Sequence, residues 1–353
     1  MDVLEWQMAV HRQSHQPDQE ITCPGNSFKC SQSTILDRMH DTPLMEEDTL
    51  QAIADTLRSS SVVEFVRMVV KTGYRPFFQN ESARVSGMVD LAFEQLAESQ
   101  RGGVDRSKLV SVTTALLENN FRKKDSTFWF NRSYDHYKTK AKPETDFQQL
   151  SNLLPGKRVL DYGSGSGYLA ARLALGGYEV FTADVLDYRY EEARRLPFVQ
   201  MESPTDIPYS DNSVDVALVQ AVLHHIGPDD LPLVLRRLGR VAKYLLIKED
   251  SYGLPTDLPG LADTLKKQPL LQTFVAMPLA MQREVLVLID FFSNAIAQGL
   301  PEMNMPFEFK TVPEWWKVLV ANGFQVNRTV LAGFEPGRMH MSCHVWFLCE
   351  RVS

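Results

Sequence analysis

The sequence predicts an α/β fold whose mostly parallel sheet carries helices on both faces, preceded by a helical subdomain. Three observations predict it. Short β-branched runs alternate with helical segments beyond about residue 145, a glycine-rich turn follows the first of these runs, and apolar residues recur at helical spacing before it. Strands that alternate with helices form parallel sheets that are covered on both faces.

Length and composition exclude several classes of protein. A chain of 353 residues with 44% hydrophobic and 23% charged residues is typical of a globular protein of about two domains. Its net charge of −7 argues against a chain that mainly binds phosphate backbones, so no nucleic-acid partner is expected. No apolar run approaches the roughly 18 residues that cross a bilayer, so no membrane partner is expected either.

The first residues lack the basic start, apolar core and cleavage site of an export signal, which predicts a cytoplasmic location with reduced cysteines. Residues 1–43 hold few periodic apolar side chains and predict a mobile N-terminal arm. Residues 44–144 are expected to form a helical cap and lid, with Asp105 capping a helix over Leu109–Leu117. Residues 121–145 lack clean periodicity and predict a connecting lid rather than a core element.

The strands of the sheet follow from short β-branched runs. They are expected at Arg158–Tyr162, Tyr178–Ala183, Val214–Val219 and Tyr244–Lys248, with a final strand over residues 339–350. The link between Asp184 and Phe198 is too short for a full crossover helix, which predicts a turn in its place.

The strongest motif is VLDYGSGSGYLA, over residues 159–170, where a strand ends in a glycine-rich turn and a helix begins at Leu169. Glycine tolerates positive φ and has no Cβ, so a cofactor can approach the backbone closely there. A dinucleotide-binding fingerprint would need glycine at the position of Tyr168, and no Gly-Lys-Ser/Thr follows for a phosphate-binding loop. The motif therefore predicts a different cofactor, unless the loop merely turns the chain.

The second strand ends in Asp184, 17 residues beyond Gly167. A carboxylate at this place in a doubly wound sheet can accept hydrogen bonds from both ribose hydroxyls. Taken with the glycine loop it predicts a ribose contact, and taken alone it fits a helix cap equally well.

Four segments together resemble a known family: VLDYGSGSGYLA, TADVLDYR, DIPYSDNSVDVALVQAVLHHI and LLIKED. They are similar to the class I S-adenosylmethionine-dependent methyltransferases, in particular the small-molecule branch called methyltransferase type 11. The resemblance covers about residues 145–252 and extends loosely through MPFEFKTVPEWWKVLVANGF. It implies a Rossmann-like, doubly wound sheet of seven strands over residues 145–353, with a helical insert at about 253–312.

The resemblance also implies S-adenosylmethionine as cofactor, S-adenosylhomocysteine as its product, and a set of binding residues. Asp161 would lie near the ammonium group of the cofactor and Asp184 near its ribose, while Glu202 or Ser203 would replace the aspartate that the family places beside adenine. The other expected cofactor-binding residues are Gly163, Ser164, Gly165, Gly167, Val185, Gln220 and Ala221.

A hydroxyl or acidic-carbon acceptor would need a base near pH 7, for which imidazole is suited. His224 and His225 follow the fourth strand and are expected to be catalytic, although a packing role fits them as well. Asp290 and Asn294 share one face of an apolar helix, and a buried carboxylate there needs a partner. We expect Asp290 to be catalytic and Asn294 to contact substrate, with a structural hydrogen bond as the alternative.

Aromatic side chains near the sulfonium would add roughly 0.5 to 2 kcal/mol of cation–π stabilisation. Trp129, Tyr134 and Tyr137 of the lid and Trp315 are expected around the acceptor, and hydrophobic clamping is the alternative for the lid residues.

No metal site is expected. His340, Cys343 and His344 would lie along the final strand, where residues four apart are separated by about 13 Å, too far to share one ion. The spacing of Cys23 and Cys30 does not fit zinc.

The sequence thus predicts a methyltransferase that acts on a small-molecule acceptor, a specialised metabolite, as a monomer or homodimer. Two alternatives remain open. One is methylation of RNA or protein, for which the basic and aromatic run at 122–130 is the only feature. The other is a non-methylating relative that binds the cofactor and acts as a scaffold or cyclase.

Overall fold

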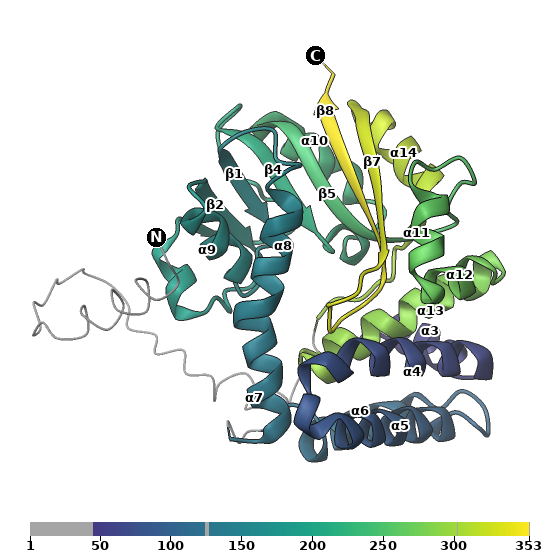
Figure 1. Cartoon of the computed structure of the whole chain (residues 1–353). Coiled ribbons are helices and arrows are strands. Elements are labelled where there is room, and N and C mark those ends of the chain that lie inside the picture. The colour runs from purple at the N-terminus through teal and green to yellow at the C-terminus, as the bar shows by residue number, and fades with distance from the viewer. Residues whose placement is uncertain (1–44, 124–126, 302, 353) are drawn as a thin grey trace, which may run out of the picture. The chain divides into compact units, whose positions relative to one another are not determined.

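The computed structural model describes residues 45–123, 127–301 and 303–352, so the arm expected at residues 1–43 lies outside the described part (Figure 1). Among the helices of the described part, none is both long and apolar enough to cross a membrane.

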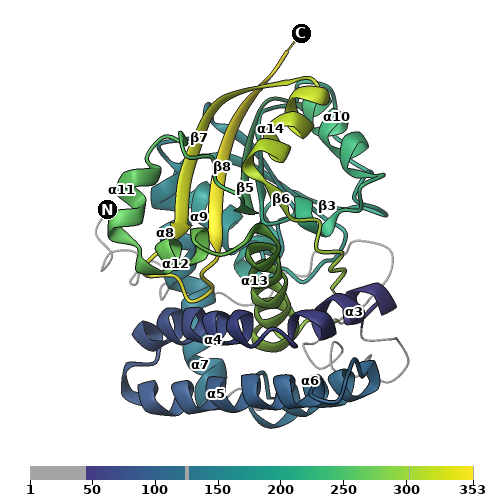
Figure 2. The ribbon, with the colours of Figure 1, turned by 90° about the vertical axis from the view of Figure 1, so that its right-hand side faces the viewer.

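The sheet follows the predicted α/β design. Its strands run in the order β3-β2-β1-β4-β5-β8-β7, with β6 pairing to β5. Figure 1 shows the part of the sheet from β2 to β7, and Figure 2 labels β3 and β6. Pairing is parallel from β3 to β5, and β8 is antiparallel to both of its neighbours. The strands are β1 (Arg158–Tyr162), β2 (Glu179–Asp184), β3 (Phe198–Gln200), β4 (Val214–Gln220), β5 (Ala242–Tyr252), β6 (Lys310–Thr311), β7 (Phe324–Phe334) and β8 (Cys343–Arg351). The expected seven strands are confirmed, with β6 as a short addition.

Helices cover both faces of this sheet because consecutive residues of its central strands, whose side chains point to opposite faces, are buried. Val159 packs with α8 (Lys142–Leu150) and α9 (Tyr168–Leu175) on one face. Leu160 belongs to the core of the opposite face, which includes α10 (Leu231–Val241) and α14 (Val312–Ala321). The short link after β2 forms only the 3-10 turn η5 (Glu191–Arg195), as its length predicts.

The strand order reverses between β1 and β4, which pair side by side. In open α/β sheets, ligands bind at the carboxyl ends of the strands where this reversal occurs. The glycine-rich turn after β1 lies at this point.

The cap consists of amphipathic helices, and Asp105 caps one of them as expected by accepting a hydrogen bond from the backbone N–H of Lys108 at 2.9 Å. Its helices are α3 (Glu47–Thr56), α4 (Ser60–Tyr74), α5 (Ser82–Ser99) and α6 (Arg106–Asn119), with the 3-10 turns η2 (Arg75–Phe77) and η3 (Gln79–Glu81).

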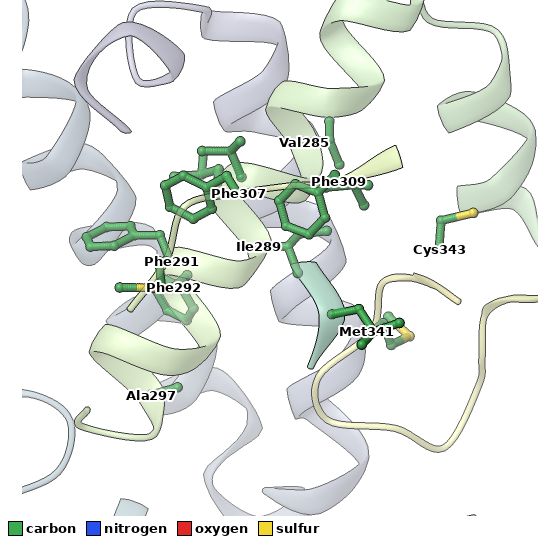
Figure 3. Packing of buried hydrophobic residues seen from close by; sticks show 14 of the residues in the cluster. Val285, Ile289, Phe291, Phe292, Ala297, Phe307, Phe309, Met341 and Cys343 are labelled. Atoms are coloured by element: carbon green, nitrogen blue, oxygen red, sulfur yellow. The ribbon is translucent and has the colours of Figure 1, made fainter. Parts of the chain in front are cut away.

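The insert between β5 and β6 joins cap and sheet through one buried helix. It contains α11 (Leu261–Lys267), α12 (Pro269–Val275), α13 (Leu279–Phe291) and the π-helix η7 (Phe292–Ala297). Helix α13 contacts α3 and α4 of the cap as well as β5 of the sheet (Figure 2). Val285 and Ile289 of α13 lie beside Phe309 in the shared core (Figure 3).

The expectation of a connecting lid over residues 121–145 is wrong. The segment enters a continuous helical run made of α7 (Trp129–His136), the π-helix η4 (Tyr137–Ala141) and α8. Its aromatic side chains are buried against the cap, where the ring of Phe130 stacks on that of Phe78 at 5.3 Å. The predicted boundary at residues 144–145 therefore falls inside α8.

The final strand also begins later than expected, at Cys343 instead of residue 339. His340 lies outside the strand because its ring packs edge-on against Tyr74 and Tyr134 of the helical region.

Candidate functional site

The glycine-rich turn after β1 holds its backbone in a conformation that favours glycine. Gly163, Gly165 and Gly167 have φ of +70°, +57° and +75°. A Cβ on Gly163 would lie 2.5 Å from the side chain of Val222, and a Cβ on Gly165 would lie 3.0 Å from the Tyr188 hydroxyl. The turn therefore fits closely between the segments that follow β4 and β2.

Replacing Gly163 by alanine is expected to destabilise the fold by about 1–3 kcal/mol more than replacing Gly177, because only the first change also overpacks the site. Both glycines have positive φ, but a Cβ on exposed Gly177 meets no atom within 4 Å. Gly177→Ala thus measures the backbone strain alone, about 1–2 kcal/mol. Urea denaturation measures the free energy of unfolding of both variants. Equal losses of this free energy would show that the turn can accommodate a Cβ at Gly163.

Asp184 at the end of β2 is tied to the glycine turn. Its Oδ2 accepts a hydrogen bond from the Gly165 N–H at 2.7 Å, and its Oδ1 accepts one from the Leu186 N–H at 3.1 Å. Burial raises the pKa of Asp184, whereas these backbone donors act against the rise. The carboxylate is therefore fixed in place beside the turn, with lone pairs left for further donors.

Asp161 lies one residue before the end of β1 and is buried. Burial raises the pKa of its carboxyl to about 7, with Lys142 acting in the opposite direction and Asp184 in the same one. A cationic ligand group beside Asp161 would favour its ionised form.

Two buried polar atoms at this edge have no hydrogen-bond partner within the described part of the chain, Ser164 Oγ and Gln220 Nε2. Buried polar groups are normally satisfied, so unpaired ones indicate a missing partner. Ala221, which follows Gln220, adopts a positive φ of +52° while its N–H donates to the Lys248 carbonyl at 2.7 Å.

Three of the residues expected to bind the cofactor lie after neighbouring strands, and two of them, Glu202 and Ser203, were expected beside adenine. Val185 follows β2 and is half-buried, and its carbonyl accepts a hydrogen bond from Gln200 at 3.3 Å. Glu202 is exposed after β3, while the Ser203 hydroxyl is hydrogen-bonded to that of Thr205 at 3.0 Å. The structure thus keeps these side chains at the same strand edge as Asp184.

A second group of polar side chains follows β4 and meets α13. The 3-10 turn η6 (Leu223–His225) carries both histidines, and Glu249 of β5 lies 2.6 Å from the His224 Nδ1. Asp290 Oδ1 lies 3.5 Å from the His224 Nε2 and 3.8 Å from the His225 Nε2. The structure therefore brings the three residues expected to be catalytic into one cluster, the His224–His225–Asp290 cluster.

The two imidazoles differ in their electrostatics. Burial opposes the charged form of His224, but Glu249 and Asp290 outweigh it and hold the pKa of this imidazole well above its usual value. Burial lowers the pKa of His225, and the neighbouring His224 lowers it further. The ring of Phe309 stacks on His224 with centroids 4.8 Å apart, which covers the cluster from the side of α13.

Asn294 makes the structural hydrogen bond that the sequence left as an alternative. Its Nδ2 donates to Asp290 Oδ1 at 2.7 Å. One turn further along the same helical run, Gln298 Oε1 accepts a hydrogen bond from Lys138 at 2.9 Å. Asn294 lies in the π-helix η7 and Lys138 in the π-helix η4, and π-helices often occur at functional sites.

The expected aromatic residues do not gather at the cluster. Trp129 packs against Phe78, and Tyr134 and Tyr137 pack around His340. Trp315 is buried against Phe347 of β8. These contacts are those of hydrophobic clamps.

His340 and His344, which the sequence analysis considered as metal ligands, contact different residues. His340 Nε2 lies 3.1 Å from the Tyr134 hydroxyl, whereas His344 lies 3.2 Å from both Asp250 and Glu335. Cys23 and Cys30 fall outside the described residues.

Sequence reasoning missed Tyr188 and Lys142. Tyr188 follows β2 and reaches Gly165, and Lys142 of α8 acts on the charge of Asp161. Lys142 pairs with Asp146 at 2.7 Å, a spacing of four residues that the sequence does show. The contact of Tyr188 has no comparable signal, because it depends on how the loop folds back.

Part of the chain is similar to known methyltransferases. Residues 160–244 match the family described as methyltransferase domain. An uncharacterized methyltransferase of Mycobacterium bovis is 28% identical over 145 residues, which are 38% of this chain and 59% of the relative. A demethylmenaquinone methyltransferase of Clavibacter sepedonicus is 33% identical over 98 residues, or 24% of this chain and 40% of the relative.

A solved structure from Burkholderia thailandensis is also similar, a 1,6-didemethyltoxoflavin-N1-methyltransferase with bound 1,6-didemethyltoxoflavin and S-adenosylhomocysteine. It is 15% identical, covers 68% of this chain and 89% of its own, and superposes with a TM-score of 0.39.

Proposed function

We propose that the chain binds S-adenosylmethionine and transfers its methyl group to a small-molecule acceptor, because residues 160–244 match the methyltransferase domain family. The matched region holds the glycine turn, Asp161 and Asp184. The cofactor, when bound, supplies an electrophilic methyl group on sulfonium. The chain itself has to bind and align the two reactants.

The cofactor site fits this proposal in two ways. The turn at Gly163, Gly165 and Gly167 brings backbone to the strand edge where side chains would collide. The unpaired Ser164 Oγ and Gln220 Nε2 offer hydrogen-bonding atoms at the same edge. Asp161 would hold the ammonium group and Asp184 the ribose hydroxyls, while Val185, Glu202, Ser203 and Ala221 would surround the adenine and the reacting end.

The acceptor side would be the His224–His225–Asp290 cluster, whose histidines follow β4 three and four residues after Ala221. The burial of this cluster carries the preference for a small molecule: His224 is 1% exposed and Asp290 is 5% exposed. A nucleic acid or a protein side chain would have to displace the ring of Phe309, which stacks on His224. Reacting atoms must come within about 3–3.5 Å of each other, which an enclosed small acceptor can do.

Calorimetric titration with S-adenosylhomocysteine tests the cofactor assignment. Wild type is expected to bind in the micromolar range, and Asp184→Ala is expected to bind about 10- to 100-fold more weakly, since hydrogen bonds to charged groups are worth about 1.5–3 kcal/mol.

Asp187→Ala is the matched control, because this exposed carboxylate follows the same strand but pairs with Arg189 at 2.9 Å. It should bind like wild type. If wild type gives neither binding heat nor a thermal shift, the proposed function is rejected.

A further inference from the structure

The His224–His225–Asp290 cluster contains ligand atoms that the protein itself leaves without partners. Within the described part of the chain, His224 Nε2 and Asp290 Oδ2 are both buried and make no hydrogen bond. The nearest approach between these side chains, 3.5 Å from His224 Nε2 to Asp290 Oδ1, is long for a hydrogen bond. Two unpaired, buried polar atoms on neighbouring side chains indicate a missing occupant.

The surrounding hydrogen bonds leave the lone pairs of the cluster directed inward. The Asn304 carbonyl can only accept, so His225 Nδ1, 2.7 Å away, carries the hydrogen and its Nε2 keeps a lone pair. His224 Nδ1 likewise donates to Glu249 at 2.6 Å, which leaves Nε2 as a ligand atom once its proton is displaced. Histidines that bind metals typically donate their other ring N–H to a carboxylate or a backbone carbonyl.

Further hydrogen bonds hold the carboxylates of Glu249 and Asp290 in place. Glu249 Oε1 accepts the backbone N–H groups of Val222 and Leu223 at 3.0 and 2.7 Å. Asp290 Oδ1 accepts from Asn294, which leaves Oδ2 free. Each of the three side chains is thus held by an outer partner from a different segment.

The spacing and charge fit a cation. One ligand atom from each of His224, His225 and Asp290 lies within 4.8 Å of the others. Ligand atoms about 2.0–2.2 Å from a tetrahedral ion lie about 3.3–3.6 Å apart, so the most widely spaced pair has to close by up to about 1.5 Å when the ion binds. Glu249 and Asp290 are two buried carboxylates, whose charge a dication would balance.

We propose that the His224–His225–Asp290 cluster binds a divalent transition-metal ion such as Zn²⁺. Two imidazoles and one carboxylate favour such ions over Mg²⁺ or Ca²⁺, which take oxygen ligands. Its position after Ala221 places the ion beside the acceptor, where it would hold and polarise the acceptor's reacting atom. That role rests on the proposed function, whereas the binding of the ion does not.

Titration of chelator-treated full-length protein with Zn²⁺, and with Co²⁺ as a spectroscopic probe, tests the proposal. Wild type is expected to bind one equivalent and to show visible Co²⁺ absorption of a low-coordinate site. Asp290→Asn and His225→Gln should weaken Zn²⁺ binding by about 100-fold or more, since loss of outer partners alone costs 10- to 100-fold. His136→Gln, an exposed histidine of α7, is the matched control and should bind like wild type.

Binding of S-adenosylhomocysteine is measured on the same samples, so that the two proposals fail separately. Absence of a stoichiometric Zn²⁺ site in wild type, or a site that both cluster variants retain, overturns the metal proposal even when S-adenosylhomocysteine binds. A Zn²⁺ site lost in both variants supports it even when S-adenosylhomocysteine does not bind.

Discussion

Replacing Arg338 by methionine is expected to destabilise the protein by about 3–5 kcal/mol, because the change leaves buried carboxylates without their partner. Arg338 lies between β7 and β8 and is 3% exposed. Its Nη1 lies 2.6 Å from Asp146 of α8, and its Nε lies 2.6 Å from Glu335. Lys142 and Lys248 complete a buried ion network at 2.7 and 3.0 Å from these two carboxylates.

The pH dependence of that loss follows from Asp146. Burial raises the pKa of its carboxyl, but Lys142 and Arg338 outweigh burial and hold this pKa well below its usual value. A depressed pKa contributes stability that is present above the unfolded value of about 4 and is lost as the pH falls further. The difference between wild type and Arg338→Met should therefore shrink below about pH 4.

Arg101→Met is the matched control for urea denaturation of Arg338→Met. The Arg101 side chain is 79% exposed and pairs with Glu98, and such surface pairs contribute at most about 1 kcal/mol. If both substitutions cost the same, the buried network does not hold α8 to the sheet.

The sheet and the cofactor loop were predictable because their signals are local. β1 was placed at its exact bounds, since a β-branched run and a glycine turn lie side by side in the sequence. Asp184 was placed at the end of β2 for the same reason, and Asp105 was recognised as a cap from its neighbours. Each of these inferences needs only a few consecutive residues.

The helical run from α7 to α8 was missed because its burial comes from distant partners. Phe130 packs against Phe78, 52 residues earlier in the chain. The sequence around Phe130 therefore lacks the regular alternation of apolar and polar residues that marks a helix with one buried face. The ion network was missed likewise, since Arg338 and Asp146 lie 192 residues apart in the chain. The sequence shows only that Lys248 interrupts an apolar strand.

The His224–His225–Asp290 cluster was predictable in part. His224 was identified as an imidazole that follows the fourth strand, and Asp290 as a carboxylate in an apolar helix. Their approach to 3.5 Å depends on α13 packing against β5, which no local pattern encodes. Sequence therefore supplied the members of the cluster but not their proximity to one another.

Binding of S-adenosylhomocysteine is expected to weaken by about 20-fold from about pH 7.5 to about pH 5.5, because Asp161 becomes protonated over this range. Burial raises the pKa of this carboxyl to about 7, so roughly three-quarters of the sites are ionised at about pH 7.5 and few at about pH 5.5. Only the ionised carboxylate attracts the ammonium group of the ligand. Calorimetry across this range measures the affinity.

A proton count separates Asp161 from other causes of pH dependence. The ligand's ammonium lowers the pKa of Asp161, so binding at about pH 6 should release close to one proton, seen as a dependence of the binding heat on the buffer. The folded pKa exceeds the unfolded value of about 4, so ionising Asp161 in the unliganded protein costs stability as the pH rises toward about 7. Asp161→Asn should bind more weakly, with a flat pH profile and no proton release. Affinity that is constant, or that increases toward low pH, would exclude Asp161 as the ammonium partner.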